Sequence, residues 1–106
     1  MVVDKNDNNK GYRGYVNYET WRIMHDYFGD MDLGELNMLL GNAVDTDKTP
    51  DQRIFSASIP IESYVDEMLE DKAPRYILES FTNNVDYYEL ADTLLEMRAE
   101  LIAYDE

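Results

Sequence analysis

The segment "DYYELADTLLEMRAELIAY", residues 86–104, decides the fold class because it has the clearest helical pattern in the chain. Asp86 and Glu89 have the spacing of a capping box, which predicts a helix that starts after Asp86 and ends near Tyr104. Apolar side chains recur along it at three- and four-residue intervals and share one face: Tyr87, Leu90, Ala91, Leu94, Met97 and Leu101. We expect this face to pack on a helical core.

Two further helices are predicted in the first half of the chain. The stretch "NYETWRIMHDYF", residues 17–28, predicts a helix that begins at Tyr18 with Asn17 as its N-cap. Gly29 is expected to end this helix because glycine tolerates a positive φ. Residues 33–44 predict a weaker helix, since they contain two glycines that each cost about 1 kcal/mol relative to alanine.

The middle of the chain carries a helix start followed by an ambiguous segment. Thr49 and Gln52 have capping-box spacing, with Pro50 at the first helical position. The next segment, "RIFSASIPI" at residues 53–61, places apolar residues at alternate positions, which is a strand pattern: Phe55, Ala57, Ile59 and Ile61. We favour a helix here and keep a short extended segment near residues 54–59 as the alternative.

Two prolines are expected to begin the remaining helices, Pro60 the first and Pro74 the second, which should end near Asn83. The pattern therefore predicts an all-α fold, a compact single domain of four to five helices. Residues 1–13 are polar and predict a flexible N-terminal arm. Residues 14–106 are expected to form one acidic helical domain.

The charge restricts the partners. The chain carries 23 acidic and 9 basic residues, a formal net charge of −14. Residues 1–61 hold ten acids and six bases, a net of −4, whereas residues 62–106 hold thirteen acids and three bases, a net of −10. Such a chain is repelled by phosphates and anionic membranes. We therefore expect no direct nucleic acid binding and no membrane binding, and a basic partner protein instead.

The absence of cysteine excludes disulfides and thiolate chemistry. No apolar run in the sequence is long enough to span a bilayer, and no signal-peptide pattern is present. These features predict a cytoplasmic protein.

Little in the sequence points to catalysis. His25 is the only histidine, no serine lies in a nucleophile-elbow context, and no glycine-rich phosphate loop is present. Acidic stretches such as "DMDLGE", residues 30–35, lack the glycine at the sixth position of a calcium loop. We predict no catalytic residue, no metal and no cofactor, and hence a protein that is not an enzyme.

The acidic residues form two stripes at helical spacing. The final helix should present one stripe opposite its apolar face, and the helix after Pro60 should present the other. The two stripes consist of Glu89, Asp92, Glu96 and Glu100, and of Glu62, Asp66 and Glu70. Like charges four residues apart destabilise a helix by about 0.2–0.5 kcal/mol per pair. The stripes are therefore either a solvated surface or a row of carboxylates that imitates the phosphates of DNA.

The aromatic residues near the start of the chain allow two interpretations. Trp21 is expected to be a structural anchor in the core, packing the first helix against the last with Tyr87 or Tyr88 nearby. The alternative is an exposed patch of Tyr15, Tyr18 and His25 that binds a partner.

Two short motifs carry a resemblance to known proteins. "NYETW", residues 17–21, and "VDYYELA", residues 85–91, resemble segments of small phage- and plasmid-encoded proteins with an Asn-Tyr-Glu-Thr-Trp signature. A second tryptophan often follows in those proteins, and "IMHDYF" stands here instead. The family has no established activity, so the resemblance implies a mobile-element origin and assigns no site residue.

These observations favour a phage-type acidic inhibitor that binds a host nucleic-acid-binding protein, with DNA mimicry as the mechanism. Its target would be a restriction or CRISPR effector, a host polymerase or a nucleoid protein. The alternative is a non-enzymatic interaction or assembly module that uses an apolar or aromatic patch. Paired tyrosines and six methionines also leave room for a homodimer.

Overall fold

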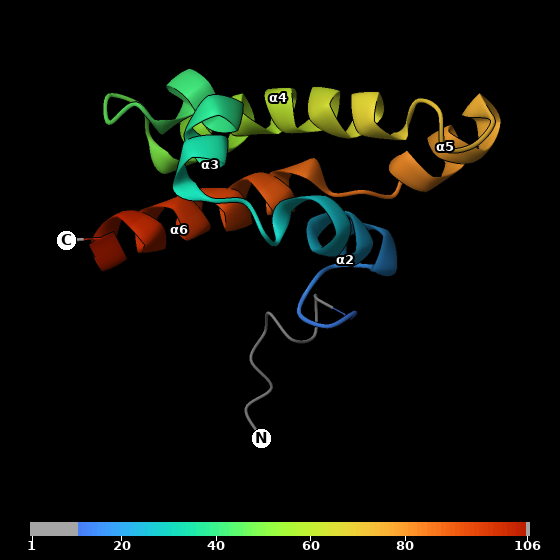
Figure 1. Ribbon diagram of the computed structural model, residues 1–106, viewed down its shortest axis with the longest axis horizontal. Coiled ribbons are helices and arrows are strands. Elements are labelled where there is room, and N and C mark those ends of the chain that lie inside the picture. The colour runs from blue at the N-terminus through green and yellow to red at the C-terminus, as the bar shows by residue number, and fades with distance from the viewer. Residues whose placement is uncertain (1–10, 106) are drawn as a thin grey trace.

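The computed structural model describes residues 11–105 of the protein (Figure 1). The elements follow in the order α2 (Tyr18–Ile23) with a π-helical continuation (Met24–Phe28), α3 (Leu33–Leu40) with a 3₁₀ continuation (Gly41–Val44), α4 (Pro50–Leu69), α5 (Arg75–Thr82) and α6 (Tyr87–Asp105). No strand occurs within these residues. The predicted all-α fold of four to five helices is confirmed.

Helices α4 and α6 lie side by side and supply the centre of the core (Figure 1). Helix α3 packs against both of them, and α2 packs against α6. The largest side chains with almost no exposure come from all four helices and the π-helical segment: Ile23, Phe28, Leu36, Leu40, Ile61, Val65, Leu90 and Leu94. The apolar face predicted for the last helix therefore packs on the core as expected.

The predicted N-caps are confirmed at three helix starts. The side chains of Asn17, Thr49 and Asp86 each accept a hydrogen bond from the backbone N–H three residues further on, at 2.9, 3.2 and 3.0 Å. The Gln52 side chain also accepts from the Thr49 N–H at 2.8 Å, which completes that capping box. These contacts satisfy N–H groups that have no partner inside the helix.

Helix α4 runs without a break through residues 54–59 and past Pro60. The extended alternative is not formed, and our prediction that Pro60 begins a new helix is wrong. A proline inside a helix costs about 3 kcal/mol because it lacks an N–H and crowds the preceding turn. Ile61 and Val65, which follow it, are fully buried. Each contributes about 1.5–3 kcal/mol by leaving water, which offsets that cost.

The first helix ends at Gly29, as predicted, but with a different backbone geometry. Gly29 has a φ of −60°, an ordinary helical value, so the expected positive φ is absent. The chain widens instead into the π-helical turn, in which the Gly29 N–H donates to the Met24 carbonyl at 2.9 Å. Gly41 does have a positive φ, +54°, and it ends α3. The predicted helix over residues 33–44 is therefore divided into an α-helix and a 3₁₀ turn.

Residues 1–10 of the predicted arm lie outside the described residues. Near its end, Tyr12 exchanges two backbone hydrogen bonds with Tyr15, at 2.9 and 2.8 Å. No helix among residues 11–105 combines the length and apolar character needed to cross a membrane.

Candidate functional site

The second half of α4 and helix α5 form an open hollow of about 470 Å³ that we call the acidic hollow. All three carboxylates of the shorter predicted stripe, Glu62, Asp66 and Glu70, line it. Glu67 and Glu79, which the sequence did not single out, bring the number of carboxylates to five. One basic residue, Arg75, also lines the hollow.

The position of the acidic hollow follows from the packing of α4. Ile61 and Val65 face the core, and Glu62 and Asp66 follow them by one position, about 100° around the helix. These carboxylates therefore lie at the margin of the buried face and remain exposed. Arg75 forms an ion pair within α5, its Nε lying 3.3 Å from a carboxylate oxygen of Glu79. Within residues 11–105, Glu62, Asp66 and Glu70 form no ion pair.

Tyr87, at the first turn of α6, lies near two of these carboxylates, Glu62 and Asp66. Its hydroxyl is buried and has no hydrogen-bond partner within the described residues. Burial raises the pKa of the Tyr87 hydroxyl well above its ordinary value, and the negative charges of Asp66 and Glu62 raise it further. The hydroxyl therefore stays protonated at physiological pH. The sequence predicted only an inward aromatic position here.

The longer predicted stripe, on α6, is not uniform. Glu89 is half-buried, and one of its carboxylate oxygens accepts a hydrogen bond from the Val16 N–H at 3.0 Å. Glu89 thereby ties the segment before α2 to the start of α6. Asp92, Glu96 and Glu100 are exposed, as predicted.

The structure does not join the two stripes into one hollow. Asp92 and Glu96 line a separate hollow together with Arg53 and Arg98. Both guanidinium groups have other acceptors, since Arg53 donates to the Lys48 carbonyl at 2.7 Å and Arg98 donates to the Asn37 side chain at 2.6 Å. Glu100 lines a third hollow with Met31 and Tyr104.

An aromatic cluster lies at the start of α2, formed by Tyr12, Tyr18, Trp21 and His25. The centroids of neighbouring rings are 5.0–6.0 Å apart. The Arg13 guanidinium lies over the Trp21 ring, 4.9 Å from its centroid. Tyr12 and Arg13 were not predicted members, since the sequence placed them in the arm.

The structure places two of the predicted aromatic residues differently from the sequence-based expectation. The expectation that Trp21 anchors the core is wrong, because Trp21 is only partly buried and lies outside the core cluster. Thr20, Ile23 and Met24 occupy the inward positions instead. Of the predicted patch, Tyr18 and His25 are exposed, whereas Tyr15 packs against the core.

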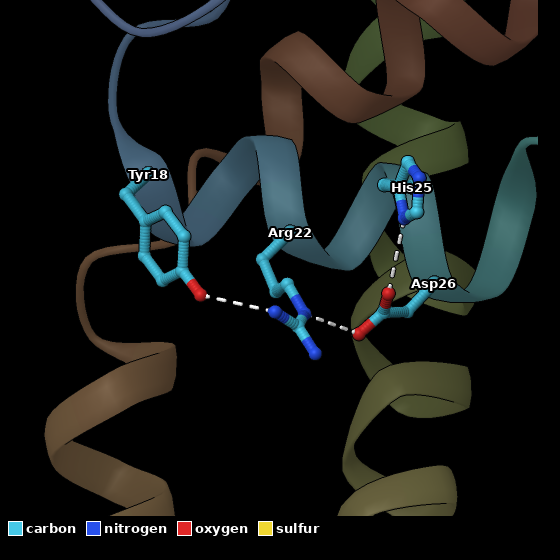
Figure 2. A network of polar contacts seen from close by, with 4 residues as sticks. All are labelled: Tyr18, Arg22, His25 and Asp26. Carbon is cyan, nitrogen blue, oxygen red and sulfur yellow. Dashed lines mark hydrogen bonds and ion pairs between the residues drawn. The ribbon is translucent and has the colours of Figure 1, made fainter.

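A line of polar contacts runs along the exposed side of α2 (Figure 2). Arg22 donates to the Tyr18 hydroxyl at 3.2 Å and to the Asp26 carboxylate at 2.6 Å, and His25 Nδ1 lies 3.2 Å from Asp26. The hydrogen bond from Arg22 lowers the pKa of Asp26, while partial desolvation opposes the shift. This network links consecutive turns of one helix and faces solvent.

Within residues 11–105, no group of three or more His, Cys, Asp or Glu side chains is arranged to hold a metal ion. Comparison of the chain with known protein families, curated proteins and solved structures finds no match.

Proposed function

We propose that this protein is a small acidic inhibitor of the phage type that binds a host nucleic-acid-binding protein in the cytoplasm and imitates DNA with its carboxylates. The target would be an effector of restriction or CRISPR defence, a polymerase or a nucleoid protein. The protein acts by occupying a basic groove and carries out no reaction of its own.

One observation carries the proposal. Six of the seven carboxylates in the predicted stripes are exposed and form no ion pair with a described basic residue: Glu62, Asp66, Glu70, Asp92, Glu96 and Glu100. The acidic hollow concentrates three of them with Glu67 and Glu79. Surface acids in a protein are often interleaved with bases. These six carboxylates form no such pairs with described bases and can therefore pair with basic side chains of a partner.

The spacing of these groups suits a basic groove. Carboxylates four residues apart on a helix are separated by about 6 Å along its axis. Their mutual repulsion costs about 0.2–0.5 kcal/mol per pair in the free protein. Lys and Arg side chains of a partner would relieve that repulsion and release counterions, as they do when they bind DNA.

The test is capture of host proteins on the immobilised protein, with elution by a salt gradient and competition by duplex DNA. We expect a DNA-binding protein that elutes at moderate salt and that added duplex displaces, since both ligands occupy the same basic groove. A captured protein that duplex DNA does not displace would contradict mimicry.

A pair of variants with equal net charge separates the stripe from charge in general. Glu62→Lys, Asp66→Lys and Glu70→Lys together should abolish capture of that DNA-binding protein. The control combines Asp30→Lys, Asp47→Lys and Asp71→Lys, which are exposed and lie outside the acidic hollow. It changes the net charge equally and should retain capture. Equal loss of capture in both variants would mean that net charge, and not the position of the stripe, determines binding.

The alternative patch of Tyr15, Tyr18 and His25 has less support as a binding surface. Tyr15 packs against the core. The ring of Tyr18 is engaged by Tyr12 and Trp21, and that of His25 by Trp21. An interaction module at this end of the molecule would use Tyr18 and His25, which are exposed, without Tyr15.

A further inference from the structure

Helix α4 has two apolar faces. Ala57, Ile61 and Val65 form one of them and are fully buried in the core. Phe55 and Ile59 form the other, and each is 55% exposed. Positions two residues apart lie about 200° apart around a helix, so these faces are nearly opposite. The alternating apolar pattern of residues 53–61 thus reflects a helix that is apolar on both sides.

The exposed face extends onto neighbouring segments. The ring of Tyr88, from α6, meets the ring of Phe55 edge-on, with centroids 6.3 Å apart. Tyr88 is 55% exposed, and Val16, from the segment before α2, is 40% exposed. Val16, Phe55, Ile59 and Tyr88, which we call the apolar face, line two hollows that share Val16 and Tyr88. Exposed apolar groups that gather in this way mark interaction sites.

The margin of the apolar face is acidic. Asp51, Glu62, Asp86 and Asp92 line the same two hollows, and no described Lys or Arg does. Arg53, on the same helix, lines a different hollow and donates to the Lys48 carbonyl. A partner must therefore be apolar at its centre and basic at its edges. A second copy of this chain would place acid against acid, which disfavours it as the occupant.

We propose that the apolar face binds a basic amphipathic helix of a partner protein. Its large apolar side chains pack against Phe55, Ile59 and Tyr88, and its Lys and Arg side chains meet the acidic margin, as in other helix-in-groove complexes. Phe55 and Ile59 are about 6 Å apart along α4, which matches apolar residues at four-residue spacing on the incoming helix. This binding differs from DNA mimicry because its central contacts are apolar residues outside the stripes, while Glu62 and Asp92 of the stripes contribute only to its margin.

The probe is a fluorescein-labelled peptide of about 18 residues, long enough for several helical turns, with leucine on one helical face and lysine on the rest. A scrambled peptide of the same composition lacks the apolar face and controls for charge attraction. We expect fluorescence anisotropy to show about tenfold tighter binding of the amphipathic peptide. This preference should persist at about 1 M salt, where the Debye length falls to about 3 Å. Equal affinity for both peptides would overturn the proposal.

Substitutions then locate the binding surface. Phe55→Ala with Tyr88→Ala should remove the preference for the amphipathic peptide. Met38→Ala with Tyr76→Ala is the matched control, because these side chains are 87% and 73% exposed on other helices. The control should keep the preference. Loss in the control, or retention in the first variant, would assign the peptide to another surface.

Two further measurements test whether the variants fold and whether the apolar face binds a second copy of the chain. Circular dichroism will show whether the double variant is folded. Ile59→Ser leaves the contact between Phe55 and Tyr88 in place and is therefore expected to fold. Because it removes an apolar side chain from the apolar face, it should weaken the preference for the amphipathic peptide. Sedimentation of the unmodified protein should give a monomer. A dimer that Ile59→Ser dissociates would assign the apolar face to a second copy and contradict a basic helical partner.

Discussion

Helices α5 and α6 follow one another in the chain and are both amphipathic, yet they are attached to the molecule in different ways. Helix α6 buries Leu90 and Leu94 completely and is capped by Asp86. Helix α5 has no buried residue, and its N-cap, Pro74, provides no side-chain hydrogen bond. Five carboxylates line the hollow between α4 and α5. Amphipathic spacing therefore predicts a helix but does not establish how much of it is buried.

The largest difference should appear when one leucine is shortened in each helix. Leu94→Ala removes a fully buried side chain from α6 and should lower the free energy of unfolding by about 2–5 kcal/mol. Leu78→Ala, at a partly buried position of α5, should lower it by less than about 1 kcal/mol. Urea denaturation measures both changes, with an unchanged slope expected for each.

Hydrogen exchange provides the check on this comparison. The amides of α5 should exchange through local opening, while those around Leu90 and Leu94 should need nearly global unfolding. Equal protection of the two helices would contradict the weak attachment of α5.

A second test concerns the contact that fixes the start of α6. Thr20 is fully buried, and its hydroxyl accepts a hydrogen bond from the Asp86 N–H at 2.9 Å, which joins α2 to α6. Thr20→Val keeps the volume but leaves this N–H without its acceptor, at a cost of about 1–3 kcal/mol. Thermal denaturation should show the loss. Thr46→Val, at an exposed turn, should change stability by less than about 0.5 kcal/mol.

The sequence predicted what depends on short-range chemistry. The caps at Asn17, Thr49 and Asp86 involve a side chain and a backbone group three residues away, so the local pattern was sufficient. Pro60 was assigned wrongly because its local preference for a helix start is outweighed by the burial of Ile61 and Val65, which only the folded molecule provides.

The candidate surfaces were harder to predict, since they depend on contacts between distant segments. The sequence placed Glu89 on an acidic stripe, but its bond to the Val16 N–H joins residues 73 positions apart. The sequence predicts Trp21 as the anchor between the first and last helices, yet Ile23 and Met24 take the inward positions. The two faces of α4 depend on the helical geometry of residues 54–59, for which the sequence pattern also allowed an extended segment.

A smaller effect is expected at the cap of α6 itself. Asp86→Ala removes the side-chain acceptor for the Glu89 N–H and should lower the free energy of unfolding by about 1 kcal/mol. Asp71→Ala, in the turn before α5, is exposed and removes the same charge without removing a cap. It should leave urea denaturation nearly unchanged. A similar loss of stability in both variants would mean that the effect of Asp86→Ala comes from the lost negative charge and not from the lost cap.

The smallest effect on stability is expected at two exposed ion pairs, one that starts in α2 and one within α5. Arg22 lies 2.6 Å from Asp26 and also contacts Tyr18, whereas the Arg75–Glu79 contact in α5 is 3.3 Å and has no such extension. Arg22→Gln should raise the pKa of Asp26 towards its ordinary value of 3.8, as a carboxyl titration by NMR would measure.

The sign of the pH dependence follows from that shift. The pKa of Asp26 is lower in the folded protein, so the stability that it contributes is present above the unfolded-state pKa and is lost as the pH falls through the folded-state pKa. Wild-type protein and Arg22→Gln should therefore converge in stability at acid pH. Arg75→Gln should match the wild type throughout, because an isolated exposed pair contributes little. If Arg22→Gln behaved in the same way, the contacts drawn in Figure 2 would add nothing to an ordinary surface pair.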